Sequence, residues 1–472
     1  MGIQTEEEPQ DILPPINDND APINDNDVLE RSTEYPDRPL INRMFGKMQE
    51  GSLRGSIFAV SSLALGTGCL SLPIRFTQVS LAGGLVSLTL GAVITYWTLT
   101  LMIKSSKNSK TRDYSRLVSE SIGKCPAIFL DATIMLYIFG VLISFQVIIY
   151  NTAGRVFFEL TGQNNSYADF DDFNKLKWDT TLYKFPIMFS ICAVLIPLCM
   201  LKDISRMRFT SMFSVCSLLY VITVVVVEAP SYYKHYLRNI RIEDDVNTHE
   251  NWYDISKAFG KDLLIFQSFA TMFFSFSCHI GAFPVYKTLA NPSVRRIQKV
   301  FKRSILIDIV LYYLVSVAGF FTAPINTPAL IIYREPKDKG IDIAMTIAKC
   351  ALCINLMLSL PANYNGFRIS FCELVMGIDT EKLSNVKNCL LTLIVLSVSC
   401  AIGAFYNNII SYITVLGGTG SVIMCFLMPG LLYVKNNGKG VTHWQNVLVM
   451  LVILVLCVIG FTGAVQMLLG VK

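Results

Sequence analysis

Long runs without a charged residue alternate with short charged segments from residue 55 to the end of the chain. These runs are 55–74, 76–103, 132–154, 185–201, 209–227, 263–286, 309–333, 388–434 and 444–471, together with 343–367, which contains only Lys349. The 388–434 run is too long for one helix and is divided by Tyr406-Asn407-Asn408. About 20 apolar residues cross a bilayer, and runs of this length satisfy their backbone groups in lipid as helices. The pattern therefore predicts an all-α integral membrane protein with about 11 transmembrane helices.

The first 50 residues have a different character. They are polar, and the segment Pro-Ile-Asn-Asp-Asn-Asp occurs at 15–20 and again at 22–27. Such a segment cannot bury enough apolar surface to offset its ordering entropy. We predict a disordered cytoplasmic tail at 1–50 and a transmembrane domain at 51–472. The acidic, polar start of the chain does not resemble a cleavable signal peptide.

The loop charges predict how the helices are oriented. With the N-terminus in the cytoplasm, the inner loops hold 20 Lys and Arg and residues 1–54 hold five, against 14 in the outer segments. Positive residues concentrate on the cytoplasmic side of membrane proteins. The same orientation places the glycosylation sequon at Asn164 outside, where glycosylation takes place.

Composition excludes several classes of protein. Hydrophobic residues are 52% of the chain and charged residues 16%, against about 25% charged in a soluble domain. A net charge of +5 with four scattered His shows no nucleic-acid footprint. The 13 Cys lie mostly in apolar runs without zinc-type spacing, which is typical of small packing residues. Without a phosphate-binding Gly-rich loop or a hydrolase motif, we expect neither an enzyme nor a cofactor.

Two of the predicted helices are interrupted at matching positions. The first contains Gly-Thr-Gly-Cys-Leu-Ser-Leu-Pro at 66–73, and the sixth contains Ser-Cys-His-Ile-Gly-Ala-Phe-Pro at 277–284. Gly relaxes the backbone, and Pro removes a hydrogen-bond donor. Inverted-repeat transporters place such breaks in corresponding helices of their two halves, where freed backbone groups bind substrate and ion. Close packing of Gly-containing helices is the alternative explanation.

These motifs resemble those of the eukaryotic amino acid/auxin permease family, which includes the sodium-coupled neutral amino acid transporters. The resemblance rests on 66–73, on Phe276-Ser277-Cys278-His279 with 283–289, and on Leu-Ser-Leu-Pro at 358–361. It implies a 5+5 inverted repeat with broken helices 1 and 6 and one extra helix. It also implies secondary active transport of an amino acid coupled to H⁺ or Na⁺. Without a charged residue in either break, a neutral amino acid is the expected substrate.

The resemblance also implies a set of site residues. The substrate would contact the unwound parts of helices 1 and 6, at Gly66, Thr67, Gly68, Ser275, Phe276 and His279. A coupling cation, with Na⁺ the only metal considered, would lie between helices 1 and 8, at Ser62, Leu65 and Ser359. Sodium-coupled members of the family carry Asn where this chain has Ser62, and Asn is the stronger oxygen ligand. We therefore favour H⁺ over Na⁺.

Several alternatives stay open on the sequence alone. A channel or an amino-acid sensor could use the same scaffold, and the membrane could be the plasma membrane or that of an acidic organelle or vacuole. His279 could titrate, although a hydrogen-bonded structural role is favoured. Lys349 is expected to extend its ammonium to the membrane surface. Asp308 is expected to be an interfacial charge at a helix start, with proton transfer as its alternative.

Overall fold

The structure is a computed structural model that describes residues 51–106, 113–161, 178–200, 208–243, 263–322, 327–334, 342–378, 383–440 and 442–470. All regular secondary structure in these ranges is helical. The predicted tail at 1–50 and the sequon at Asn164 lie outside the described residues.

The helices follow the predicted order along the chain. The first half contains α3 (Leu53–Ala64), η1 (Thr67–Ser71), α4 (Leu72–Ser105), α5 (Tyr114–Ser121), α6 (Lys124–Thr161), α8 (Trp178–Met200) and α9 (Arg208–Glu243). The second half contains α10 (Ile265–Ser275), η8 (His279–Gly281), α11 (Ala282–Thr288), α12 (Val294–Thr322), η9 (Ile331–Tyr333), α13 (Ile343–Phe371), η10 (Cys372–Met376) and α14 (Asn385–Phe405). The last part contains α15 (Ile409–Leu416), η12 (Gly417–Ser421), η13 (Ile423–Leu427), α16 (Met428–Asn436) and α17 (Trp444–Leu468).

Within the described ranges, nine helical segments are long and apolar enough to cross a membrane, and Leu53–Ala64 and Met188–Met200 are shorter apolar helices. One of the nine, Thr67–Ser105, is interrupted at Ser80 and so belongs to two predicted helices. Leu53–Ala64 is the first half of the broken first helix, and Met188–Met200 belongs to the fourth. Counted this way, the structure agrees with the prediction of about 11 membrane helices.

The boundary between the first two membrane helices differs from the prediction. The charge pattern places it at Arg75, but Arg75 lies within α4 and the backbone turns at Ser80, with φ 68° and ψ 163°. The Ser80 hydroxyl accepts a hydrogen bond from the Gly83 amide, as the cap of a new helix does. A positive φ is uncommon outside Gly and is maintained here by burial.

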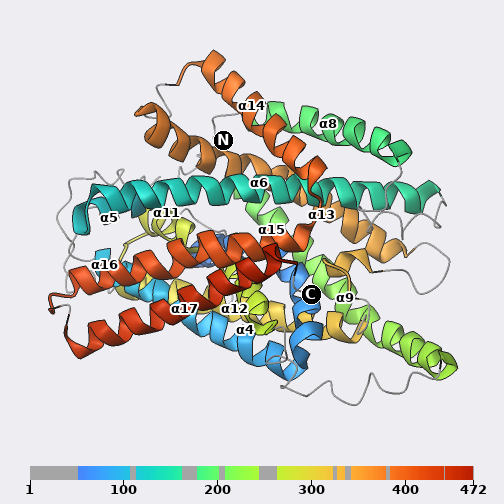
Figure 1. Ribbon diagram of the computed structural model, residues 1–472, viewed down its shortest axis with the longest axis horizontal. Coiled ribbons are helices and arrows are strands. Elements are labelled where there is room, and N and C mark those ends of the chain that lie inside the picture. Colours follow the sequence, from blue (N-terminus) through green and yellow to red (C-terminus); the bar gives the residue numbers. More distant parts are fainter. Residues whose placement is uncertain are drawn as a thin grey trace, which may run out of the picture.

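Each of the first four membrane helices packs against its counterpart from the second half. The break at η1 contacts α10, α4 contacts α12, α6 contacts α13, and α8 contacts α14. Figure 1 shows α6 extending across the molecule, with α8 and α14 on one side of it and α4, α12, α16 and α17 on the other. Helices 1, 2, 6 and 7 thus form one group, and helices 3, 4, 8 and 9 form another. This pairing is what a 5+5 repeat requires.

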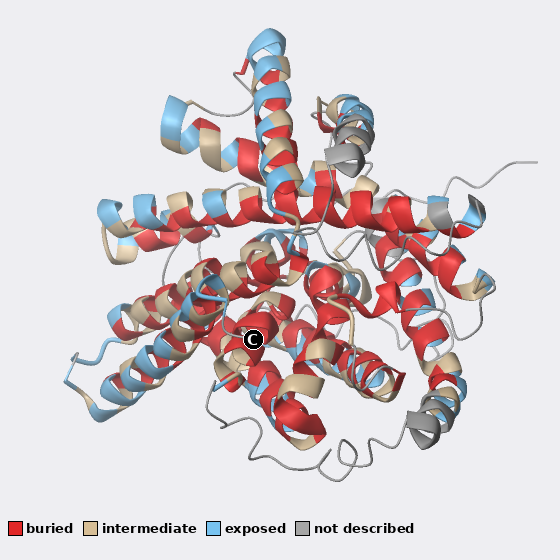
Figure 2. Cartoon of the chain, turned by 45° about the vertical axis from the view of Figure 1, so that its right-hand side comes forward, coloured by how far each residue is buried: buried red, intermediate tan, exposed pale blue. Residues whose placement is uncertain are grey.

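Burial follows this arrangement. The apolar window of the span Lys124–Phe157 is 78% buried, whereas those of α14 and α17 are each 39% buried. Figure 2 shows α6 buried along most of its length and exposed at its ends. The exposed side chains of α17 are mainly large and apolar, including Leu451, Leu454 and Val458, as a surface facing lipid requires.

Helix α10 is packed unusually closely by its neighbours. A Cβ atom on Gly417 would lie 1.9 Å from the carbonyl oxygen of Ala270, and one on Gly463 would lie 2.3 Å from that of Phe266. Small residues allow membrane helices to bring their backbones together in this way. The first half of broken helix 6 is therefore fixed by backbone contacts with η12 and α17.

We expect Gly417→Ala to lower stability by roughly 1–3 kcal/mol, because the added methyl group forces α10 and η12 apart. Thermal unfolding of the detergent-purified protein, followed by size-exclusion chromatography, measures this. Gly440→Ala is the matched control, since its Cβ would approach only Thr442 Oγ1, at 4.0 Å. Equal melting temperatures for the two variants would contradict the packing argument.

Candidate functional site: two interrupted helices

The first interruption begins where α3 ends at Ala64. Leu65 and Gly66 have non-helical backbones, and the Gly66 amide donates to the Ala64 carbonyl in a tight turn of 2.7 Å. The chain then forms η1, whose capping interactions include Ser71 Oγ donating to the Gly68 carbonyl at 2.7 Å. Helix α4 begins at Leu72, and Pro73 is its second residue. The predicted break at 66–73 is therefore present, and its unwound part is Leu65–Gly66.

The second interruption lies between α10 and α11. Helix α10 ends at Ser275, and Phe276 and Cys278 have non-helical dihedral angles. One turn of 3₁₀ helix, η8, joins this segment to α11. The predicted break at 277–284 thus begins at Phe276, one residue earlier than its Gly and Pro pattern indicates.

The two interruptions are in contact. A Cβ atom on Gly68 would lie 2.7 Å from Ser275 Oγ and 2.9 Å from the Phe274 ring, so only Gly allows η1 to approach α10 this closely. The Tyr312 hydroxyl of α12 lies 2.7 Å from the carbonyl oxygens of both Ala64 and Ser275, the last residues of the two half-helices. Its ring packs on Phe276 with centroids 4.9 Å apart. A single side chain therefore connects both half-helix ends.

Polar atoms without a partner lie at this junction. Among the residues that the structure describes, the buried Thr67 hydroxyl has no hydrogen-bond partner, and neither has Nδ1 of His279. The other ring nitrogen of His279 pairs with Thr98 Oγ1 at 2.9 Å, which is the structural role that the sequence favours. A Cβ on Gly66 would meet no atom within 4 Å, so space is open beside the unwound backbone. Open space and unsatisfied polar atoms are what a polar ligand requires.

The residues predicted for the cation are less closely associated. The Ser62 hydroxyl donates to Ala59 O at 2.9 Å, and the Ser359 hydroxyl pairs with Asn355 Oδ1 at 3.3 Å. Each hydroxyl thus bonds within its own helix. Among the described residues, no hydrogen bond joins Ser359 to Ser62 or to the Leu65 carbonyl. The six predicted substrate residues lie in or beside the two breaks. Their role and that of the three predicted cation residues both stay predictions.

Arg75 is a site residue that the sequence pattern does not reveal. Its guanidinium is 1% exposed and donates to Thr271, Gln78, Gln267 and Thr414. It follows Pro73 by two residues and so connects the start of α4 to α10 and α15. All four acceptors are neutral, which is rare for a charge buried at membrane depth. In a sequence, a charged residue between two apolar runs normally indicates a loop. The pattern therefore does not predict that Arg75 is buried.

The expectation for Asp308 is wrong. Asp308 lies fourteen residues into α12, and its side chain is fully buried. It is on the same face as Ser304 and Tyr312, one turn away in each direction, and this face packs on α3 and η1. The basic loop preceding α12 suggests an interface, but α12 already contains that basic sequence as its first turns.

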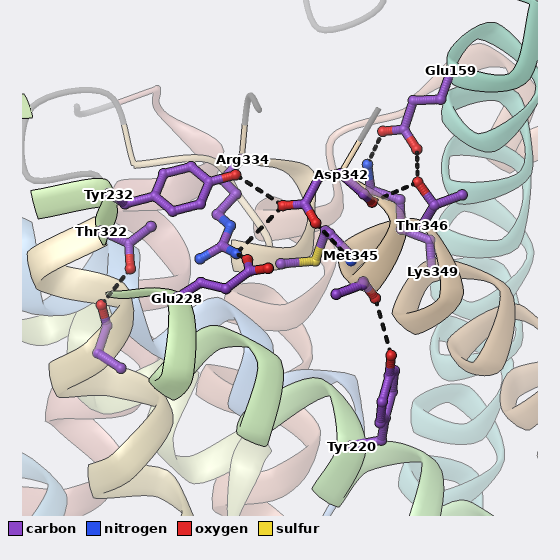
Figure 3. Close-up of polar contacts among 12 residues, drawn as sticks. Glu159, Tyr220, Glu228, Tyr232, Thr322, Arg334, Asp342, Met345, Thr346 and Lys349 are labelled. Atoms are coloured by element: carbon purple, nitrogen blue, oxygen red, sulfur yellow. Dashed lines mark hydrogen bonds and ion pairs between the residues drawn. The ribbon is translucent and has the colours of Figure 1, made fainter. Parts of the chain in front are cut away.

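The expectation for Lys349 is also wrong. Its ammonium forms a buried ion pair with Glu159 of α6, and Thr346 donates to the other oxygen of the same carboxylate at 2.8 Å. Figure 3 shows this pair beside a second group, in which Arg334 pairs with Glu228 of α9 and Tyr232 donates to Asp342 at 3.0 Å. The charge of Lys349 on α13 is thus compensated by Glu159 on α6, and that of Glu228 on α9 by Arg334, which follows η9. A partner on another helix stabilises Lys349 at depth, so it has no need to reach the surface.

The segment 330–334 lies between these charges and the first break. Leu330, Ile331 and Ile332 are fully buried, and Ile331 lies near Gly319 and Pro73. The Tyr333 hydroxyl pairs with Thr152 at 3.1 Å, and Arg155 lies over the Tyr333 ring at 4.6 Å. We call residues 330–334 the plug. Through η9, the plug contacts η1 and lies near Gly319, toward the end of α12 that is farther from Val294.

Comparison with known proteins agrees with this geometry. Residues 49–470 match the family described as transmembrane amino acid transporter protein. Sodium-coupled neutral amino acid transporter 7 of Mus musculus is 23% identical over 81% of this chain and 79% of its own length. The same transporter of Danio rerio is 25% identical over 81% and 78%. The crystal structure of MhsT in complex with L-phenylalanine has a TM-score of 0.52 and 12% identity, over 87% of this chain and all of that one.

Two interrupted helices in contact within a 5+5 helix repeat define a membrane transporter of the inverted-repeat class. The family match covers nearly all of the transmembrane region. This chain belongs to the transmembrane amino acid transporter family. It is a multi-pass membrane protein and not an enzyme.

Tyr312→Phe is expected to lower stability by about 1–3 kcal/mol, because it removes the donor that serves two buried carbonyl groups. Thermal unfolding in detergent measures the change. The adjacent Tyr313→Phe serves as the control, since Tyr313 bonds Thr89 and the Leu85 carbonyl, away from the junction. A larger loss for Tyr313→Phe would refute the role given to Tyr312.

Removing one member of the buried Lys349–Glu159 pair should lower stability more than Tyr312→Phe does. Glu159→Gln leaves an ammonium group without its carboxylate and is expected to cost about 3–5 kcal/mol. The double variant Glu159→Gln, Lys349→Met removes both charges and should recover most of the lost stability. The same thermal measurement applies, and a double variant less stable than the single one would show that the charges do not act as a pair.

Proposed function

We propose that this protein is a secondary active transporter that carries a neutral amino acid in symport with a cation. The observation that carries the proposal is the junction of the two interrupted helices, where, within the described part of the chain, space is open at Gly66 and polar atoms of Thr67 and His279 have no hydrogen-bond partner. A half-helix N-terminus favours a carboxylate, and free carbonyl groups favour an ammonium. A zwitterion satisfies both requirements. The relatives' printed names support a neutral amino acid.

In this proposal, Gly66, Thr67 and Gly68 bind the substrate from helix 1, and Ser275, Phe276 and His279 bind it from helix 6. Phe276 and Tyr312 form an aromatic wall beside the breaks. With no ionised side chain among these six residues, a charged substrate side chain would be buried without a partner, which is costly. This supports a neutral substrate.

The proposed coupling ion is H⁺. Ser62 stands where an Asn would give a stronger sodium ligand, and its hydroxyl bonds within α3. Sodium is the second candidate, because the names of both relatives include sodium coupling. The proposed orientation has the N-terminus in the cytoplasm and the plug on the outer or luminal side, in the plasma membrane or that of an acidic organelle.

Uptake into proteoliposomes tests the proposal. With an inward proton gradient we expect a radiolabelled neutral amino acid to accumulate above its external concentration, and with an inward sodium gradient alone we expect simple equilibration. Gly68→Val, whose side chain would collide with Ser275 and Phe274, should abolish uptake. Accumulation driven only by sodium would assign sodium symport. Equilibration under every gradient would contradict active transport and favour a channel.

A further inference from the structure

The buried carboxyl group of Asp308 lies directly behind the junction. On the same face of α12, Ser304 donates to the Ile57 carbonyl of α3 at 3.0 Å, and Tyr312 contacts both half-helix ends. Asp308 lies five residues, or about 7.5 Å, along α12 beyond Arg303, the last basic residue of that helix, and its side chain is fully buried in the protein. It is therefore neither at the surface nor part of the paired charges near the plug.

The groups around this carboxyl come from three other segments. The polar groups that interact electrostatically with it include Ser61 of α3, Cys69 of η1, Cys278 of the second break and Tyr312 on its own helix. Neither carboxyl oxygen has a hydrogen-bond partner within 3.5 Å among the described residues. None of these neighbours is a base or a cation, and Arg75 bonds elsewhere. An ionised carboxylate enclosed in this way is strongly unfavourable, so the group must bind a proton or a cation.

The surroundings suit a proton better than a metal cation. A hard cation such as Na⁺ prefers several oxygen ligands, and two of the four neighbours here are thiols. A proton requires only one carboxyl oxygen and no coordination shell.

We propose that Asp308 is the proton-binding residue that couples transport to a proton gradient, an inference that rests on the proposed symport. When α3 moves away from α12, water reaches the carboxylate, which takes a proton from hydronium and becomes a neutral acid. When the group is enclosed again, as in this structure, the neutral form is the stable one. Release to water on the other side regenerates the carboxylate. Tyr312, one turn away, connects this event to the substrate-binding backbone of both breaks.

Proteoliposomes containing the full chain separate the coupling step from substrate binding. A gradient of about one pH unit sustains about tenfold accumulation at one proton per substrate. We expect Asp308→Asn to lose this accumulation while it still exchanges labelled for unlabelled substrate across the membrane, because exchange requires no net proton movement. Asp308→Glu, which retains a carboxyl group, should retain some accumulation.

The control variant is Asp131→Asn, since Asp131 lies near the start of α6, is only partly buried and accepts a hydrogen bond from Ser115 at 2.6 Å. Its accumulation should match that of the unsubstituted protein. Proton uptake on substrate addition, read with a pH-sensitive dye on the unsubstituted protein in detergent, gives a measurement independent of any variant's folding.

The outcomes are distinct. Full accumulation by Asp308→Asn would overturn the inference and leave the proposed symport intact. Accumulation driven only by sodium, or substrate binding without proton uptake, would also overturn it. Failure of the unsubstituted protein to accumulate substrate under either gradient would overturn both proposals. Loss of accumulation with exchange retained in Asp308→Asn alone would support Asp308 as the coupling residue.

Discussion

Backbone groups in lipid must find a partner within the protein, and this chain interrupts two helices at the centre of the membrane domain. A few nearby side chains provide partners for the backbone groups at these interruptions. Tyr312 serves the last carbonyl groups of α3 and α10 together, Ser71 and Cys69 bond carbonyl groups of the first break, and Gly68 allows the two segments to touch. The glycines of η12 and α17 allow these helices to pack closely on α10. This packing fixes the position of α10 and so maintains the junction.

Charge is distributed unequally between the two groups of helices. In and beside the group of helices 3, 4, 8 and 9, Lys349 pairs with Glu159 and Arg334 with Glu228, although the buried Arg368 bonds the neutral Asn365 and Asn388. In the group of helices 1, 2, 6 and 7, Arg75 donates to four neutral acceptors, and Asp308 has no hydrogen-bond partner within 3.5 Å among the described residues. Paired charges favour one fixed arrangement, whereas unpaired ones make the stability of a conformation depend on what binds. The Lys349–Glu159 pair therefore favours one packing of helices 3 and 8, whereas the stability of the packing around Asp308 depends on what binds there.

Much of this architecture can be predicted from the sequence. The charge-free runs predict the helices, and Gly and Pro at 66–73 and 277–284 locate both breaks to within a few residues. The errors share one cause. Arg75, Asp308 and Lys349 were each interpreted from their neighbours along the chain, but an ionised side chain is stabilised or destabilised by neighbours in space. Glu159 precedes Lys349 by 190 residues, which no local pattern reveals.

The sequence by itself determined that the chain is helical, spans a membrane and breaks two helices, because lipid leaves the polar backbone of an apolar segment few alternatives. Only the tertiary structure decided which charges are paired, that the Tyr312 hydroxyl reaches both half-helices, and that Asp308 faces the junction. Those outcomes depend on the face that each helix presents and on its distance from the next helix. Both are set by packing between segments far apart in the chain.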